Sequence, residues 1–144
     1  MSTPQTKSGF VNIDRAQIYY ETAGKGTSFV MIHAGVADSR QWNNEFAFFA
    51  RNHQVLRYDM RGYGKSEPVD GEFSHISDLV SVLNTLELQE PLVMMGCSMG
   101  GGLAMDFALA SIENESLNYG WLRTQWLEIG RAHISQICRS GEGF

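Results

Sequence analysis

The sequence has no long run of positive charge and no long run of apolar residues. Eleven Lys and Arg residues stand against sixteen Asp and Glu residues, which gives a net charge of −5, and no basic run of five residues occurs. This balance argues against a nucleic-acid-binding protein. No segment is apolar over the length of a bilayer, and the polar start, residues 1–7, lacks the apolar region of a signal peptide. We therefore expect a cytoplasmic protein with no membrane partner.

Cysteine is scarce, and its positions do not suggest a metal site. The chain holds only Cys97 and Cys138. In a chain without a secretory signal, two such residues are expected to be free thiols rather than a disulfide. No set of Cys and His residues has the spacing of a zinc site. The sequence therefore predicts neither a structural bridge nor a bound metal.

The glycine-rich segments do not match the patterns of nucleotide-binding loops. The two G-x-G pairs that start at Gly24 and Gly62 lack the third glycine of a dinucleotide fingerprint. Gly64-Lys65-Ser66 ends like a phosphate-binding loop, but Asp59 stands where the first glycine of that motif would be. An aspartate at that place would repel phosphate, so no nucleotide cofactor is expected.

Apolar segments suited to strands alternate with segments suited to helices. At 144 residues and 43% hydrophobic residues, the chain is large enough for one domain with a real core. Alternation of strands and helices predicts an α/β fold with a mostly parallel sheet, flanking helices and an amino-terminal β-hairpin. The expected strands are 10–14, 16–21, 29–32, 54–58 and 92–95, and helices are expected after residue 38, after residue 74 and from residue 100 to about 110.

Two helix starts carry recognisable caps. Asp38 and Gln41 have the spacing of a capping box, and the aromatic residues that follow recur at helical spacing, so they should form one stripe against the sheet: Trp42, Phe46 and Phe49. Ser74 is expected to cap the next helix, with Asp78 in its first turn. The predicted apolar face of that helix consists of Ile76, Leu79, Val80, Leu83 and Leu86.

The segment Gly96-Cys97-Ser98-Met99-Gly100 is the most informative part of the chain. It follows the apolar strand 92–95 and precedes a helix-forming stretch, so it has the pattern G-x-S-x-G between a strand and a helix. In this setting the serine occupies a strained turn, and small residues are needed two positions before and after it. The sequence therefore predicts a serine hydroxyl raised above the sheet at the start of a helix.

Four motifs together resemble the amino-terminal half of an α/β-hydrolase fold protein, over roughly residues 10–110. They are the His-Gly-like segment Ile32-His33-Ala34-Gly35, Trp42 in the helix that follows, the D-x-R-G-x-G-x-S loop from Asp59 to Ser66, and the G-x-S-x-G segment. Ala34 replaces the glycine usual in the first motif. The resemblance implies a hydrolase, and the serine within it implies acyl transfer rather than the epoxide or haloalkane chemistry that an aspartate at this position would suggest.

The resemblance also assigns roles to individual residues. Ser98 would be the nucleophile, and the backbone N–H groups of Met99 and Gly35 would bind the oxyanion, with Val36 as the alternative to Gly35. The expected substrate is a small ester, lactone or related acyl compound. Asp59 and Arg61 are expected to hold their glycine loop in place.

The catalytic acid and histidine of such proteins are not identified in this sequence. His33 is expected to pack beside the floor of the site, and His53 and His75 to lie at a helix end and a helix start. His133 and Glu128 could act only if the tail folded back over the serine, and Asp106 would point away from it.

The carboxyl-terminal residues depart from the family pattern. We expect residues 1–110 to be the amino-terminal portion of one α/β-hydrolase domain and 111–144 to be an atypical tail with apolar residues at helical spacing, as in a truncated chain. The strand 92–95 would then be an uncharged sheet edge and would promote self-association unless the aromatic tail covered it. Two functions follow as hypotheses: a serine hydrolase that is incomplete in this chain, or a catalytically inactive truncated product or interaction module.

Overall fold

The structure is a computed structural model that describes residues 4–88 and 91–113. Contacts divide the chain into two units, Met1–Ala104 and Met105–Phe144. The strands are β1 (Lys7–Ile13), β2 (Ala16–Ala23), β3 (Ser28–Ile32), β4 (Gln54–Tyr58) and β5 (Leu92–Gly96). The helices are the short 3-10 helix η1 (Ser39–Trp42), α1 (Asn43–Phe49), α2 (His75–Leu86) and α3 (Met99–Glu113). Within the described ranges, no helix combines the length and the apolar character that crossing a bilayer requires.

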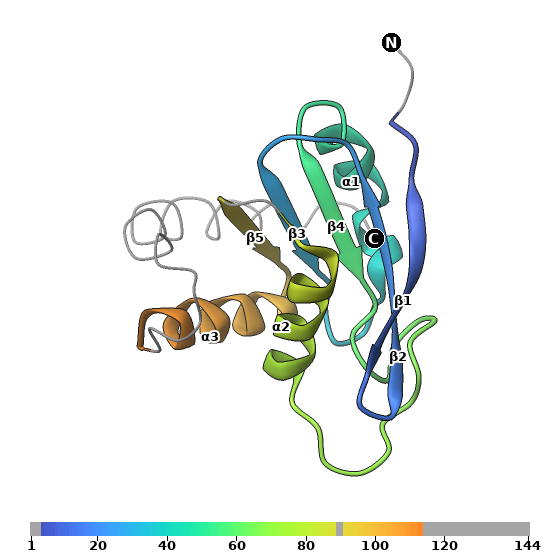
Figure 1. Cartoon of the computed structure of the whole chain (residues 1–144), viewed down its shortest axis with the longest axis vertical. Helices are drawn as coiled ribbons and strands as arrows, with labels where there is room; N and C mark the ends of the chain where they lie inside the picture. The colour runs from blue at the N-terminus through green and yellow to red at the C-terminus, as the bar shows by residue number, and fades with distance from the viewer. Residues whose placement is uncertain (1–3, 89–90, 114–144) are drawn as a thin grey trace. The chain divides into compact units, whose positions relative to one another are not determined.

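The five strands form one mixed sheet in the order β1-β2-β4-β3-β5 (Figure 1). β1 and β2 form the predicted antiparallel hairpin, and β2 is also antiparallel to β4. β3 is parallel to both β4 and β5 and lies between them. The predicted α/β class is confirmed, and the carboxyl ends of β3, β4 and β5 meet at one end of the sheet.

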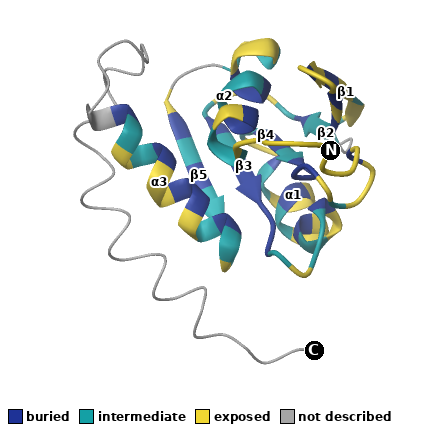
Figure 2. Ribbon diagram, turned by 90° about the horizontal axis from the view of Figure 1, so that it is seen from below, coloured by how far each residue is buried: buried dark blue, intermediate teal, exposed yellow. Residues whose placement is uncertain are grey.

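The two faces of the sheet are covered by different helices. Figure 2 shows α1 and α2 on opposite sides of the sheet, with β3 in the colour of buried residues between them. On the α1 side, Trp42 and Phe46 pack with the buried strand residues Met31 and Val55, and Phe49 stacks on Phe29 with ring centroids 4.8 Å apart. The predicted aromatic stripe is therefore confirmed, because its members cover this face.

The predicted cap of α2 is confirmed, but its buried face is partly different. Ser74 accepts a hydrogen bond from the N–H of Ser77 at 3.4 Å. The buried residues of α2 are Asp78, Leu79, Val82 and Leu83, whereas three predicted members of the face are only half-buried: Ile76, Val80 and Leu86. The buried face of α2 is rotated relative to the predicted one because Asp78 is buried in an ion pair with Arg61. We had expected Asp78 to interact only with the helix dipole.

The capping box predicted from Asp38 to Gln41 is also only partly correct. Asp38 caps η1 by accepting from the N–H of Arg40 at 2.9 Å. The Gln41 side chain does not return to Asp38; its Oε1 accepts from the N–H of Ala34 at 2.9 Å. The first turn is 3-10 rather than α-helical, so the residue three positions after the cap reaches the loop after β3 instead.

β5 is an edge of the sheet among the residues that the structure describes. It pairs with β3 on one side, and no described strand pairs with its other side. Leu92 and Met94 are buried on one face, whereas Val93, Met95 and Cys97 remain half-exposed on the other. The predicted edge is confirmed for this part of the chain, and the predicted helical tail lies outside it, apart from residues 111–113.

Candidate active site

Ser98 lies in a tight turn between β5 and α3, with a backbone conformation that few residues adopt. Its φ is +51°, one of only three positive values at described residues other than glycine. This left-handed conformation is strained for a residue with a side chain, and such strain is concentrated at functional sites. The residue is exposed. The predicted strand, sharp turn and helix are therefore all present, with the hydroxyl accessible at the amino end of α3.

Gly96 and Gly100 are required because backbone approaches them closely. A Cβ on Gly96 would lie 2.3 Å from the carbonyl oxygen of Gly100. A Cβ on Gly100 would lie 2.3 Å from the carbonyl oxygen of Ile32 and 2.5 Å from that of His33. Both contacts are with backbone, which cannot give way as a flexible side chain could. The two glycines thus let the first turn of α3 rest against the end of β3.

The candidate oxyanion donors lie next to each other. Met99 is the first residue of α3, so its N–H has no acceptor within the helix. Gly35 and Val36 form the middle of a turn closed by a 3.1 Å hydrogen bond from the N–H of Ala37 to the oxygen of Ala34. A Cβ on Gly35 would lie 3.2 Å from Sδ of Met99. Within residues 4–88 and 91–113, the N–H groups of Gly35, Val36 and Met99 donate to no protein acceptor.

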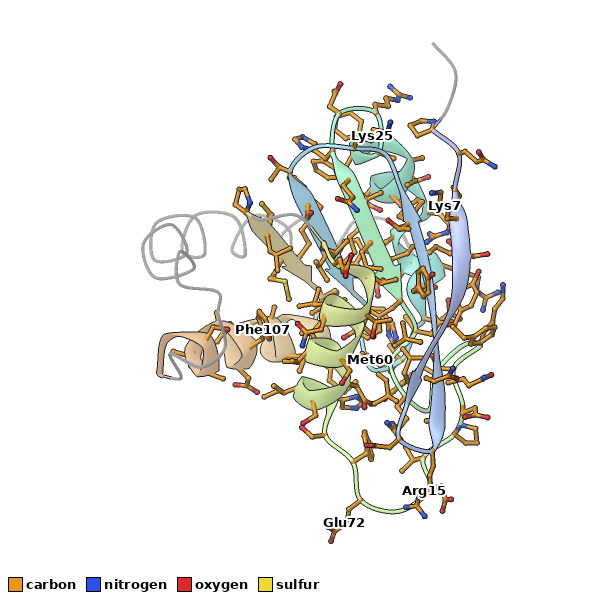
Figure 3. All side chains as sticks on the ribbon, in the orientation of Figure 1. Lys7, Arg15, Lys25, Met60, Glu72 and Phe107 are labelled. Atoms are coloured by element: carbon orange, nitrogen blue, oxygen red, sulfur yellow. The ribbon has the colours of Figure 1, made fainter. Side chains whose placement is uncertain are left out.

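His33 is fully buried below this turn, and both of its ring nitrogens are occupied. Its Nδ1 lies 2.7 Å from the oxygen of Ala34, and its Nε2 lies 3.0 Å from the backbone nitrogen of Met60. Because the N–H of Met60 must donate to Nε2, the proton of the neutral ring is on Nδ1 and is donated to Ala34. Figure 3 labels Met60, which is buried and follows the end of β4. His33 therefore has a structural place under the site and no nitrogen free to act as a base.

The loop from Asp59 to Ser66 is hydrogen-bonded within itself and to two helices, η1 and α2. The carboxylate of Asp59 accepts from the N–H of Ser39 at 2.7 Å and from the N–H of Lys65 at 2.8 Å. Arg61 forms two hydrogen bonds with the carboxylate of Asp78, at 2.7 and 2.8 Å, and both side chains are buried. The hydrogen bonds that Arg61 donates to the Asp78 carboxylate raise the pKa of Arg61. These contacts agree with the structural roles expected for Asp59 and Arg61.

Tyr63 in this loop is a site neighbour that the sequence analysis missed. Its ring packs edge-on against His33, with centroids 5.1 Å apart, and its hydroxyl lies 4.0 Å from Sδ of Met99. Tyr63 and Val36 also line an open hollow of about 690 Å³ beside the turn, and Val36 is 97% exposed. The hollow places apolar and polar surface next to the candidate oxyanion donors. In the sequence, Tyr63 was marked only as a variable position of the D-x-R-G-x-G-x-S motif.

The remaining candidate acids and bases are not gathered around Ser98. His53 precedes the amino end of β4, at the opposite end of the parallel strands from Ser98. His75 begins α2, where burial lowers its pKa. Asp106 is exposed on α3, and Glu128 and His133 lie outside the described residues. In the described part of the chain, no three His, Cys, Asp or Glu residues are grouped to hold a metal ion.

Comparison with known proteins matches the sequence to one family. The model of the "Alpha/beta hydrolase family" matches residues 29–135. The chain belongs to the α/β-hydrolase family. The match begins within the segment that carries the resemblance and extends beyond residue 110, to residue 135.

The relatives include hydrolases of several kinds. The chain is 29% identical over 113 residues to 2-hydroxy-6-oxo-6-(2'-aminophenyl)hexa-2,4-dienoic acid hydrolase of Metapseudomonas resinovorans, over 72% of this chain and 38% of that protein. It is 33% identical over 122 residues to 2-hydroxy-6-oxononadienedioate/2-hydroxy-6-oxononatrienedioate hydrolase of Paraburkholderia xenovorans, over 76% of this chain and 42% of that protein. The chain thus spans about two fifths of the length of these curated relatives.

Solved structures show the same fold. Est816, described as an N-acyl homoserine lactone degrading enzyme, superposes with a TM-score of 0.66 at 32% identity, over 70% of this chain and 40% of that one. An epoxide hydrolase from Vigna radiata superposes with a TM-score of 0.66 at 15% identity, over 72% of this chain and 34% of that one. The α/β-hydrolase fold of the described residues is therefore shown by both sequence and structure.

Proposed function

We propose that this chain carries the nucleophile and the oxyanion-binding groups of a serine hydrolase that acts on a small ester, lactone or related acyl compound. The observation that supports this most is the conformation of Ser98, which is strained, exposed and held at the amino end of α3. The partial positive charge of a helix amino end favours a negative charge that develops there. The lactone-degrading structural relative Est816 is consistent with this substrate class.

The proposed reaction uses these positions. Ser98 Oγ forms a bond to the carbonyl carbon of the substrate while the carbonyl π electrons move to oxygen, and the hydroxyl proton passes to a base. The resulting oxyanion accepts hydrogen bonds from the N–H groups of Met99 and Gly35. Collapse of the intermediate expels the alcohol, which takes up a proton, and leaves an acyl-serine ester that water hydrolyses.

A second function is favoured by the positions of the histidines. A serine hydroxyl is a weak nucleophile without an adjacent base, and both nitrogens of His33 are occupied. If no base reaches Ser98, the chain is a non-catalytic module that retains the fold of a hydrolase.

Labelling with an alkyl fluorophosphonate distinguishes the two functions. We expect a covalent adduct that mass spectrometry assigns to Ser98 and that is absent in Ser98→Ala. Ser77→Ala is the matched control, because Ser77 is also an exposed serine in the first turn of a helix, and it should be labelled like the wild type. A folded wild-type chain that forms no adduct would contradict the hydrolase and support the non-catalytic module.

A further inference from the structure

The Gly35 N–H is useful as an oxyanion donor only if its direction is fixed, and Gly35 lies in a loop turn. We propose that Gln41 is a positioning residue that fixes this direction from η1, with His33 holding the other side of the turn. The inference rests on the proposed function, because it concerns the same oxyanion site. It follows from the orientation of two consecutive peptide groups.

The first peptide group joins His33 to Ala34. The N–H of Ala34 donates to Oε1 of Gln41 at 2.9 Å. In a planar trans peptide, the carbonyl of His33 must point the opposite way. That carbonyl faces α3, since a Cβ on Gly100 would lie 2.5 Å from its oxygen. This peptide is therefore held between the Gln41 side chain on one side and the first turn of α3 on the other.

The second peptide group joins Ala34 to Gly35. The oxygen of Ala34 accepts from Nδ1 of His33 at 2.7 Å and from the N–H of Ala37 at 3.1 Å. By the same planarity, the N–H of Gly35 points away from these two donors. Gly35 itself lies against the Met99 side chain, because a Cβ placed on it would lie 3.2 Å from Sδ and 3.5 Å from Cβ of Met99.

Gln41 can act in this way because η1 is itself fixed. Its own N–H donates to the oxygen of Asp38 at 3.0 Å, and the N–H of the preceding Ser39 donates to the Asp59 carboxylate at 2.7 Å. Ala34 is only 8% exposed, so water does not readily replace the lost acceptor if Gln41 loses its carboxamide. The released peptide would then rotate and carry the Gly35 N–H with it.

The test compares four forms of this 144-residue chain: wild type, Gln41→Met, Gln41→Glu and Asn44→Leu. Methionine keeps the shape of glutamine and removes the acceptor, whereas glutamate keeps an acceptor oxygen. Asn44→Leu is the matched control, because it replaces another carboxamide by an apolar group at an exposed position in the adjoining α1. The structural readout is hydrogen exchange of the Ala34 amide and the NMR shift of the Gly35 amide.

We expect Gln41→Met to lose protection of the Ala34 amide and to shift the Gly35 amide, while Gln41→Glu and Asn44→Leu remain close to the wild type. The second readout is the rate of Ser98 labelling by the fluorophosphonate, which should fall about tenfold to hundredfold in Gln41→Met, because small misplacements of a catalytic group have effects of this size. Gln41→Glu should recover most of that rate.

The two readouts separate failure of this inference from failure of the proposed function. Unchanged Ala34 and Gly35 amides in Gln41→Met overturn the inference whether or not Ser98 is labelled. Disturbed amides with a wild-type labelling rate also overturn it, because Gln41 would then be structural only. A wild-type chain that is not labelled overturns the proposed function, and shifted amides in Gln41→Met would still support Gln41 as the residue that orients Gly35.

Discussion

Replacement of Gly100 by alanine should destabilise the chain, although alanine is the better helix former. The helix-propensity gain is about 1 kcal/mol. Against it stands a Cβ placed 2.3 Å from the oxygen of Ile32 and 2.5 Å from that of His33. Overpacking against neighbours costs about 1–3 kcal/mol, and the upper end applies because both contacts are with backbone. The difference is a net loss of about 2 kcal/mol.

Gly102 provides the matched control on the same helix. It is exposed, and a Cβ there would meet nothing within 4 Å. Gly102→Ala should therefore stabilise the chain by about 0.5–1 kcal/mol. In thermal unfolding followed by circular dichroism, about 4 °C per kcal/mol is expected for a chain of this size. Gly100→Ala should then melt about 8 °C below the wild type and Gly102→Ala about 3 °C above it.

The comparison has a clear refuting result. If Gly100→Ala melted at or above the wild-type temperature, as Gly102→Ala is expected to do, α3 would not rest on the end of β3. The position of Ser98 relative to the turn after β3 would then have lost its structural basis.

Three further predictions concern the ion pairs and the sheet edge. Arg61→Leu should lower the free energy of unfolding, measured with urea, by about 3–5 kcal/mol, because it leaves the buried Asp78 carboxylate unpaired. The double variant Arg61→Leu with Asp78→Leu should recover part of this loss. Equal stability of the wild type and the single variant would show that the pair is not buried in solution. Hydrogen bonds from Arg40 lower the pKa of Asp38 from 3.8 to about 2, so the stability that Asp38 adds is present above about pH 4 and is lost as the pH falls towards 2. Asp38→Asn should therefore lower the free energy of unfolding at pH 6 by less than about 1 kcal/mol, since the Arg40 side chain is 80% exposed. The urea midpoints of the variant and the wild type should converge at pH 2. A difference between the two midpoints that widens on acidification would contradict this. Val93→Lys should reduce self-association through β5, so that light scattering gives a mass closer to the 16.1 kDa monomer. Phe48→Lys, which removes an exposed apolar side chain away from β5, should not have this effect, and a wild-type chain that is already monomeric would refute the association.

Local patterns in the sequence were sufficient to predict much of the fold. The alternation in residues 10–21 predicted the hairpin, and the apolar run 29–32 predicted the buried strand β3. The G-x-S-x-G pattern predicted the turn in which Ser98 has a positive φ. Each of these signals depends on residues that are neighbours in the chain. The cap at Ser74 was predictable for the same reason.

The features that were missed depend on contacts between distant residues. Asp78 is seventeen positions from Arg61, and nothing in its own segment showed that it would be buried and rotate the packed face of α2. Gln41 had the spacing of a capping residue, but the 3-10 turn directed its side chain to Ala34. The role of Tyr63 also depends on the approach of its loop to His33 and Met99, which only the tertiary structure fixes.

The most direct measurement is a crystal structure of the chain after reaction with the fluorophosphonate. The phosphonyl group on Ser98 resembles the tetrahedral intermediate, and its free oxygen marks the position of the oxyanion. That oxygen should lie about 2.7–3.1 Å from the backbone nitrogens of Met99 and Gly35. A phosphonyl oxygen that points into solvent, with neither nitrogen in hydrogen-bond range, would contradict the assignment of this turn as the oxyanion site.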